Sequence, residues 1–238
     1  MKNGSLPTVG FDRFIALSWA DYALDLAMVR GDWEQLREWL SMHIEGKESA
    51  RKTYNVLCNI WLRSYPETES IREDALELAE TVPNQDRIIL HWGMSIANFA
   101  LFRSSVVTIG RLVRLQDQFR KSEISQRVLE TYSNQGTIPR SVYRIIQSLE
   151  EWTVIKKVGR DSYTSQEVKP ITDKKLIAWL LVAALSIDCE KHWSVDDVLR
   201  LPELFPFDLG SLGHVVLRED TLFKLHVEGM NRQYVSLS

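Results

Sequence analysis

The stretch from Ser122 to Ser165 reads SEISQRVLETYSNQGTIPRSVYRIIQSLEEWTVIKKVGRDSYTS. It holds two short amphipathic segments, a polar turn between them, and a β-branched segment that leads into a second turn. Thr137 is suited to cap the second segment, and Pro139 would lie in its first helical turn, where proline costs nothing. The pattern predicts helix, turn and helix, followed by a hairpin.

The segment from Pro139 to Trp152 has two chemically different faces. Apolar residues recur at helical spacing and predict a stripe that packs on a core: Val142, Ile145, Ile146 and Leu149. A second face offers guanidinium, phenol and amide groups, which suit phosphates and base edges in a major groove. It holds Arg140, Tyr143, Arg144 and Gln147, and we count Ser141 with them as a candidate contact.

The flanking residues extend this pattern into a winged helix-turn-helix. Ile124, Val128 and Leu129 give the preceding helix its own apolar contacts, and residues 133–136 favour a tight turn. After the second helix, Thr153–Val158 and Ser162–Thr164 predict two strands joined by a turn at residues 159–161. The wing would therefore carry three basic residues near its tip: Lys156, Lys157 and Arg160.

Positive charge is concentrated in this region. Between Arg120 and Arg160 there are eight basic and four acidic residues, although the whole chain has a net charge of −3. A basic region on an acidic protein is typical of a nucleic-acid contact, because phosphates supply most non-specific affinity. Arg51 and Lys52, on an earlier predicted helix, would extend this contact; a solvated helix face explains them equally well.

Composition indicates an ordinary globular protein. The chain has 238 residues, 45% of them hydrophobic and 26% charged, which is enough for two or three small units. The two cysteines, Cys58 and Cys189, have no partner motif, and this fits a reducing cytoplasm. The most apolar run, Leu176–Ile187, has twelve residues. Because a membrane-spanning helix needs about 20, we expect a buried helix and no membrane contact.

Helical periods predict a mainly α fold in three parts: a helical bundle over residues 1–104, the winged helix-turn-helix over 105–170, and a helix with a small β-rich unit over 171–238. We found no internal sequence repeat. The expected helices of the first two parts are Phe11–Val29, a segment capped by Asp32, Ser49–Arg63, Ile71–Ala79, a helix from Asp86 and Val106–Phe119. In the third part we expect a helix capped by Thr172, a capping box from Ser194 to Asp197, and strands at Val215–Leu217, Leu222–Val227 and Gln233–Leu237.

The sequence carries no sign of catalysis. It has no phosphate-binding glycine loop, no dinucleotide fingerprint and no histidine pair at metal-ligand spacing. His91, beside Trp92 on an apolar helix, is expected to be a hydrogen-bonded core residue. Glu150 and Glu151 end a helix, where solvation and the helix dipole account for them. We therefore expect neither enzymatic activity nor a cofactor or metal.

Several segments together resemble the BrxA family of the BREX phage-exclusion systems. They are DWEQLREWL (Asp32–Leu40), ARKTYNVLCNIWLR (Ala50–Arg63), the apolar segment Ile88–Phe102, and RIIQSLEEWTVI (Arg144–Ile155). The β-rich tail after Leu204 is longer than in that family. The resemblance implies a non-catalytic DNA-binding accessory protein in antiviral defence, working with other defence proteins.

Three other functions fit the same residues. A transcriptional regulator would bind a palindromic site through a dimer. A scaffold would use the winged unit to dock a partner protein and would have little affinity for DNA. An RNA-binding protein fits less well, because the predicted surface has few exposed aromatic residues.

Overall fold

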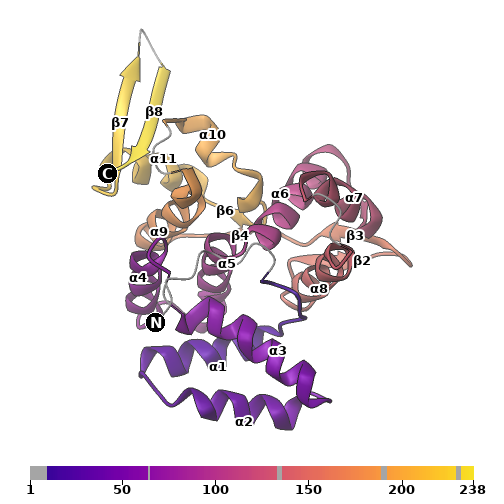
Figure 1. The fold of residues 1–238 in the computed structure, drawn as a ribbon. Helices are drawn as coiled ribbons and strands as arrows, with labels where there is room; N and C mark the ends of the chain where they lie inside the picture. The colour runs from indigo at the N-terminus through magenta and orange to yellow at the C-terminus, as the bar shows by residue number, and fades with distance from the viewer. Residues whose placement is uncertain (1–9, 64, 133–135, 189–191, 229–231) are drawn as a thin grey trace.

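The computed structural model describes residues 10–63, 65–132, 136–188, 192–228 and 232–238. Over these residues the chain is mainly helical, with eleven α-helices and three small sheets (Figure 1), and this confirms the expected mainly helical character. The buried apolar side chains form one cluster that includes residues from every part of the chain. The division into three domains stays a prediction.

The N-terminal part consists of four α-helices. The first starts later than expected, because Phe11 and Ile15 are fully buried in a non-helical segment and the Phe11 ring packs against Phe99 and Phe102. Asp32 caps the second helix as predicted, by accepting a hydrogen bond from the Glu34 amide. The elements are α1 (Leu17–Met28), α2 (Trp33–His43), α3 (Lys47–Leu57), a π-helical turn (Cys58–Leu62) and α4 (Glu69–Ala79).

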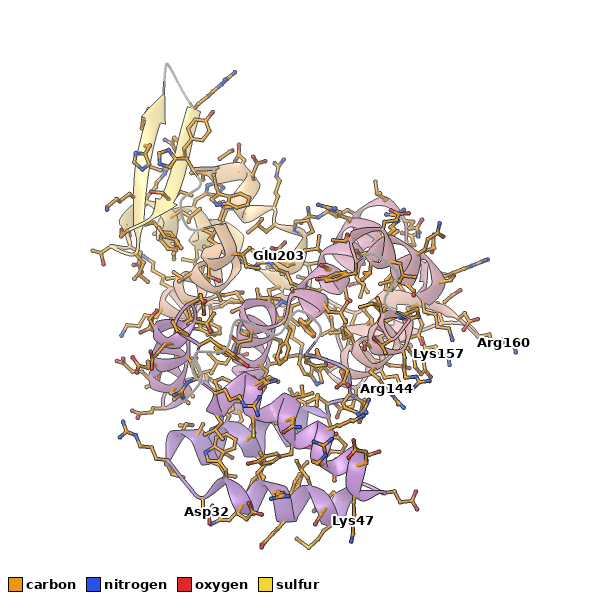
Figure 2. All side chains as sticks on the ribbon, in the orientation of Figure 1. Asp32, Lys47, Arg144, Lys157, Arg160 and Glu203 are labelled. Carbon is orange, nitrogen blue, oxygen red and sulfur yellow. The ribbon has the colours of Figure 1, made fainter. Side chains whose placement is uncertain are left out.

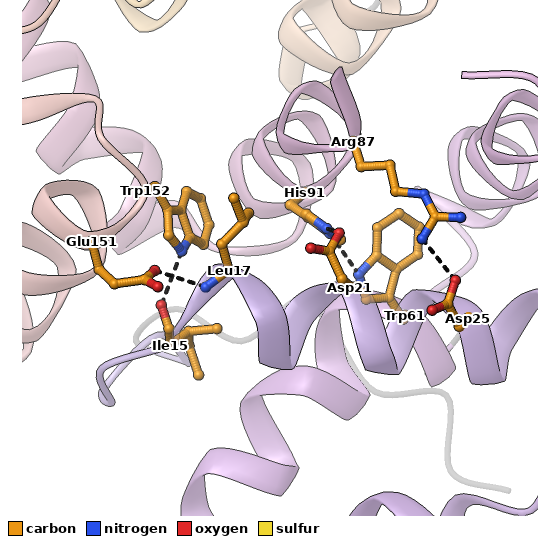
Figure 3. Close-up of polar contacts among 9 residues, drawn as sticks. All are labelled: Ile15, Leu17, Asp21, Asp25, Trp61, Arg87, His91, Glu151 and Trp152. Atoms are coloured by element: carbon orange, nitrogen blue, oxygen red, sulfur yellow. Dashed lines mark hydrogen bonds and ion pairs between the residues drawn. The ribbon is translucent and has the colours of Figure 1, made fainter. Parts of the chain in front are cut away.

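Helix α5 (Arg87–Asn98), preceded by a 3-10 turn (Asn84–Asp86), lies in the middle of the molecule. Every residue from Ile88 to Asn98 is buried. The expectation for His91 is confirmed: the ring has no exposed surface, accepts a hydrogen bond from Trp61 and contacts Asp21 on α1 (Figure 3). These contacts join α5 to the N-terminal helices.

The next elements are α6 (Ala100–Leu115), β1 (Phe119–Arg120), α7 (Lys121–Thr131), α8 (Ile138–Glu151), β2 (Ile155–Lys157) and β3 (Ser162–Ser165). The three strands form an antiparallel sheet in the order β1-β3-β2, which confirms the predicted hairpin. Helix α6 ends at Leu115 and does not reach Phe119 as expected. Phe119 is buried and pairs with Tyr163 in the sheet instead. Residues 133–135 of the predicted turn lie outside the described residues.

The C-terminal part begins with a short parallel pair between β4 (Lys169–Pro170) and β6 (Phe207–Asp208). Its helices are α9 (Lys174–Leu185), α10 (Val195–Leu199) and α11 (Gly210–Glu219), with 3-10 turns at Ser186–Asp188 and Pro202–Leu204. Its second sheet joins β5 (Trp193–Ser194), β8 (Arg232–Leu237) and β7 (Phe223–Glu228) in that order. The expected turn at residues 229–231 lies outside the described residues.

Three predictions for this part were wrong. Val215–Leu217 belongs to α11, where Val216 and Leu217 are buried, instead of forming a strand. Asp173, and not Thr172, caps α9 by accepting hydrogen bonds from two backbone amides. The side chain of Ser194 makes no capping hydrogen bond to α10.

Among the described residues, no single helix is both long and apolar enough to cross a membrane. One pair, Asn84–Asn98 with Ala100–Leu115, meets the length and composition criteria only when the two are taken together across a 114° bend. The described residues also contain no group of three or more His, Cys, Asp or Glu side chains that could hold a metal ion. Cys58 is buried, and Cys189 lies outside the described residues.

Candidate nucleic-acid interface

Helix α8 is held in place along its whole length. The predicted apolar stripe is buried, with Val142, Ile145, Ile146 and Leu149 at most 1% exposed. At the C-terminal end, the Trp152 indole donates to the Ile15 carbonyl (Figure 3). The Ile15 amide donates to the Ser148 hydroxyl. The helix therefore presents one fixed face to solvent.

The outer face of α8 carries most of the predicted contact residues. Arg140 is exposed, and Tyr143 is 38% exposed. Arg144 and Gln147 are half-buried and bonded to each other, with the guanidinium donating to the amide oxygen at 2.9 Å. Ser141 differs from these residues, because its side chain is buried and donates to the Thr137 carbonyl. It lies on the core side of the helix, so we leave it out of the interface.

The β2–β3 hairpin adds three exposed cations: Lys156, Lys157 and Arg160. Lys156 pairs with Thr164 and Lys157 with Tyr163, so their side chains leave the sheet on opposite faces. In Figure 2, Arg144 of α8, Lys157 and Arg160 lie on one side of the molecule. The structure thus brings Lys157 and Arg160 of the hairpin to the same side as Arg144 of the helix, while Lys156 leaves the sheet on the opposite face.

Lys121, at the start of α7, joins these two elements. Its ammonium lies 2.8 Å from the Asp161 carboxylate in the hairpin turn and 5.1 Å from the centre of the Tyr143 ring. The hydrogen bond from Lys121 lowers the pKa of Asp161, and the same bond raises the pKa of Lys121. The sequence shows Lys121 only as one basic residue among several, because its neighbours are distant along the chain.

A shallow pocket of about 280 Å³ separates the start of α7 from α8. Its floor is apolar, formed by Val142 and Ile146, while Lys121 and two serines lie at its polar edge. The serines are Ser122 and Ser125. An ammonium and two hydroxyls beside an apolar floor can bind a phosphate oxygen and accept an apolar edge such as a thymine methyl.

The other two predicted contacts lie elsewhere. Arg51 and Lys52 are on α3, and both form ion pairs with Glu48, at 2.8 and 3.4 Å. The hydrogen bond from Arg51 lowers the pKa of Glu48 to about 2. Part of their charge is therefore balanced locally, and neither residue belongs to α8 or the hairpin.

No protein-family model, curated protein or solved structure matches this chain.

Proposed function

We propose that residues 100–165 form a winged helix-turn-helix that binds double-stranded DNA without catalysing a reaction. The observation that carries this proposal is the set of exposed cations on two adjoining elements, Arg140 on α8 and the lysines and arginine of the β2–β3 hairpin. The order helix, strand, helix, helix, hairpin and the sheet order β1-β3-β2 support it. In this arrangement α8 enters the major groove.

Each residue has an expected role. Arg140 and Arg144 contact phosphates or guanine edges, and Tyr143 and Gln147 add hydrogen bonds. Lys156, Lys157 and Arg160 contact the backbone or minor groove beside the helix. Lys121 is paired with Asp161 at 2.8 Å, so its charge, like that of Arg51 and Lys52, is partly balanced locally, and we do not count it among the phosphate contacts.

The resemblance to the BrxA family supports a place for this activity in phage defence. In that setting the protein would be a cytoplasmic accessory subunit, bound to DNA and to other defence proteins. The resemblance rests on the segments quoted from the first 165 residues.

The proposal is tested by fluorescence anisotropy of a labelled duplex at several salt concentrations. We expect Arg140→Ala/Lys157→Ala to bind more weakly than wild type and to lower the salt slope by about two units, since each phosphate contact contributes about 0.9. The control is Arg37→Ala/Lys47→Ala, which removes the same charge from α2 and α3 and is expected to bind like wild type.

Two results would overturn the proposal. One is an absence of wild-type binding at low salt. The other is an unchanged affinity of Arg140→Ala/Lys157→Ala, which would favour a scaffold that docks a partner protein. Arg51→Ala/Lys52→Ala tests whether the α3 cations contribute to DNA binding. We expect this variant to bind DNA with wild-type affinity.

A further inference from the structure

The C-terminal part repeats the architecture of residues 100–165. Its elements α9, β5, α10, α11, β7 and β8 follow the order of α6, β1, α7, α8, β2 and β3, with a 3-10 turn after α9 and a 3-10 turn and β6 between α10 and α11 as additions. Both sheets place the third strand between the other two. In both units the first strand runs directly into a helix, and three residues separate the last helix from the second strand. The chain therefore contains two copies of one arrangement.

The strand pairing aligns the two copies residue by residue. Phe119 pairs with Tyr163 in the first sheet, and Trp193 pairs with Val235 in the second. When these two pairs are matched, Arg160 lies three residues before Tyr163 of the central strand β3. Arg232 lies three residues before Val235 of the central strand β8. Lys156 and Lys224 each occupy the second position of the second strand. The two lysines thus occupy equivalent positions, whereas Arg160 lies in the turn before β3 and Arg232 is paired with Glu228 in the longer second hairpin.

Arg232, but not Lys224, borders a pocket of about 390 Å³ where the start of α10, helix α11 and β8 meet. Arg218 and Arg232 line it and are exposed, and Arg218 donates to the Gln233 side chain at 3.3 Å. Neither arginine takes part in an ion pair in the described part of the chain. His214 and Tyr234 add further hydrogen-bonding groups, and Asp196 is the acidic residue of the lining.

Helix α11 differs from α8 on its outer face. Counted back from the strand that follows, Tyr143, Arg144 and Gln147 of α8 correspond to Ser211, Leu212 and Val215 of α11. These three positions of α11 hold no guanidinium or amide that could read a base edge, and Arg218, the arginine of α11, lies near the end of the helix beyond them. The cations of the second unit are therefore suited to phosphates, which carry no direct sequence information.

We infer that the C-terminal repeat is a second DNA contact, which binds backbone phosphates through Arg218, Lys224 and Arg232 without reading sequence. This inference rests on the proposed DNA binding by the first repeat. In Figure 1 the two hairpins project in different directions from the body of the molecule, so the second repeat contacts a different stretch of the duplex.

The test compares anisotropy titrations on a duplex of about 12 base pairs, roughly one helical turn, with a duplex of about 40 base pairs. Arg218→Ala/Arg232→Ala is expected to weaken binding to the long duplex several-fold, and to lower its salt slope by about two units. Binding to the short duplex stays unchanged. Asp196→Asn removes the carboxylate from the pocket and is expected to strengthen binding to the long duplex.

The gain in the Asp196→Asn variant cannot come from misfolding, and a thermal melt checks that the double variant is folded. The inference is overturned if Arg218→Ala/Arg232→Ala binds the long duplex as tightly as wild type, while Arg140→Ala/Lys157→Ala still loses binding. An absence of wild-type binding to either duplex instead overturns the proposed function itself.

Discussion

His91 shows how one buried polar side chain joins three elements. Its Nδ1 accepts a hydrogen bond from the Trp61 indole at 3.1 Å, so the ring proton of the neutral form is on Nε2, which lies 3.0 Å from the Asp21 carboxylate. Burial lowers the pKa of His91, although Asp21 opposes this effect. The neutral ring is therefore the form that the folded protein stabilises.

This lowered pKa gives a pH dependence of known sign. In the unfolded chain a histidine titrates near its ordinary pKa of about 6.5. As the pH falls below that value, the unfolded state binds more protons, so we expect the free energy of unfolding to decrease, by at most about 1.4 kcal/mol per pH unit. The decrease stops once the pH is below the pKa of the folded state.

Urea unfolding of wild type and His91→Gln between pH 7.5 and 5 measures this effect. The variant cannot titrate at this position, so its stability should depend less on pH than that of wild type. Equal pH dependence in the two proteins would show that His91 is not protonated on unfolding.

At the scale of the element, the C-terminal end of α8 caps the start of α1. Glu151 accepts a hydrogen bond from the Leu17 amide at 2.7 Å, and Leu17 is the first residue of α1. Ala16, the residue before α1, has no side chain able to cap it, so the carboxylate of α8 satisfies a free amide of another helix. The sequence-based expectation that solvation and the helix dipole account for Glu151 missed this contact.

Removing this carboxylate should destabilise the protein. We expect Glu151→Ala to lower the free energy of unfolding by about 1 kcal/mol, as for loss of a helix cap. Glu150, the preceding residue, is the matched control, since it is not the residue that caps α1, and Glu150→Ala should cost less than about 0.5 kcal/mol. Equal losses measured by urea unfolding would contradict the assigned role.

Across the whole molecule, α6 holds the two repeated units together. Arg103 on α6 forms an ion pair with Glu203 at 2.9 Å, and both side chains are largely buried, at 12% and 7% exposed. Arg103 also donates to the Ala184 carbonyl of α9. A Cβ atom at Gly110 would overlap the Pro202 backbone, so glycine allows this close approach. The relative position of the two candidate DNA contacts depends on this junction.

Breaking the buried pair should therefore be costly. Glu203→Ala leaves the Arg103 guanidinium without its carboxylate, and we expect a loss of about 3–5 kcal/mol. Arg103→Met/Glu203→Leu removes both charges and should recover most of this loss. Glu219→Ala is the control: its ion pair with Lys174 is exposed, and its loss should cost at most about 1 kcal/mol. Similar stabilities of Glu203→Ala and Glu219→Ala in urea unfolding would rule out this role for the junction.

The sequence alone determined the features that depend on neighbouring residues. The mainly helical fold, the buried stripe of α8, the β2–β3 hairpin and the Asp32 cap follow from side-chain spacing within a few residues, which sets local backbone structure. The same spacing indicated Arg140, Tyr143 and the hairpin cations as a surface. It misassigned Val215–Leu217, since a short β-branched run fits a strand as well as a buried helix turn.

Only the tertiary structure decided what lies beside these elements. It brought Lys121 to Asp161 and Tyr143, Glu151 to α1, and Arg103 to Glu203. It also revealed that the elements from α9 to β8 repeat the arrangement of those from α6 to β3. The physical reason is that these contacts join residues up to 134 positions apart. Such pairs meet only when the whole core packs, and no local spacing encodes them.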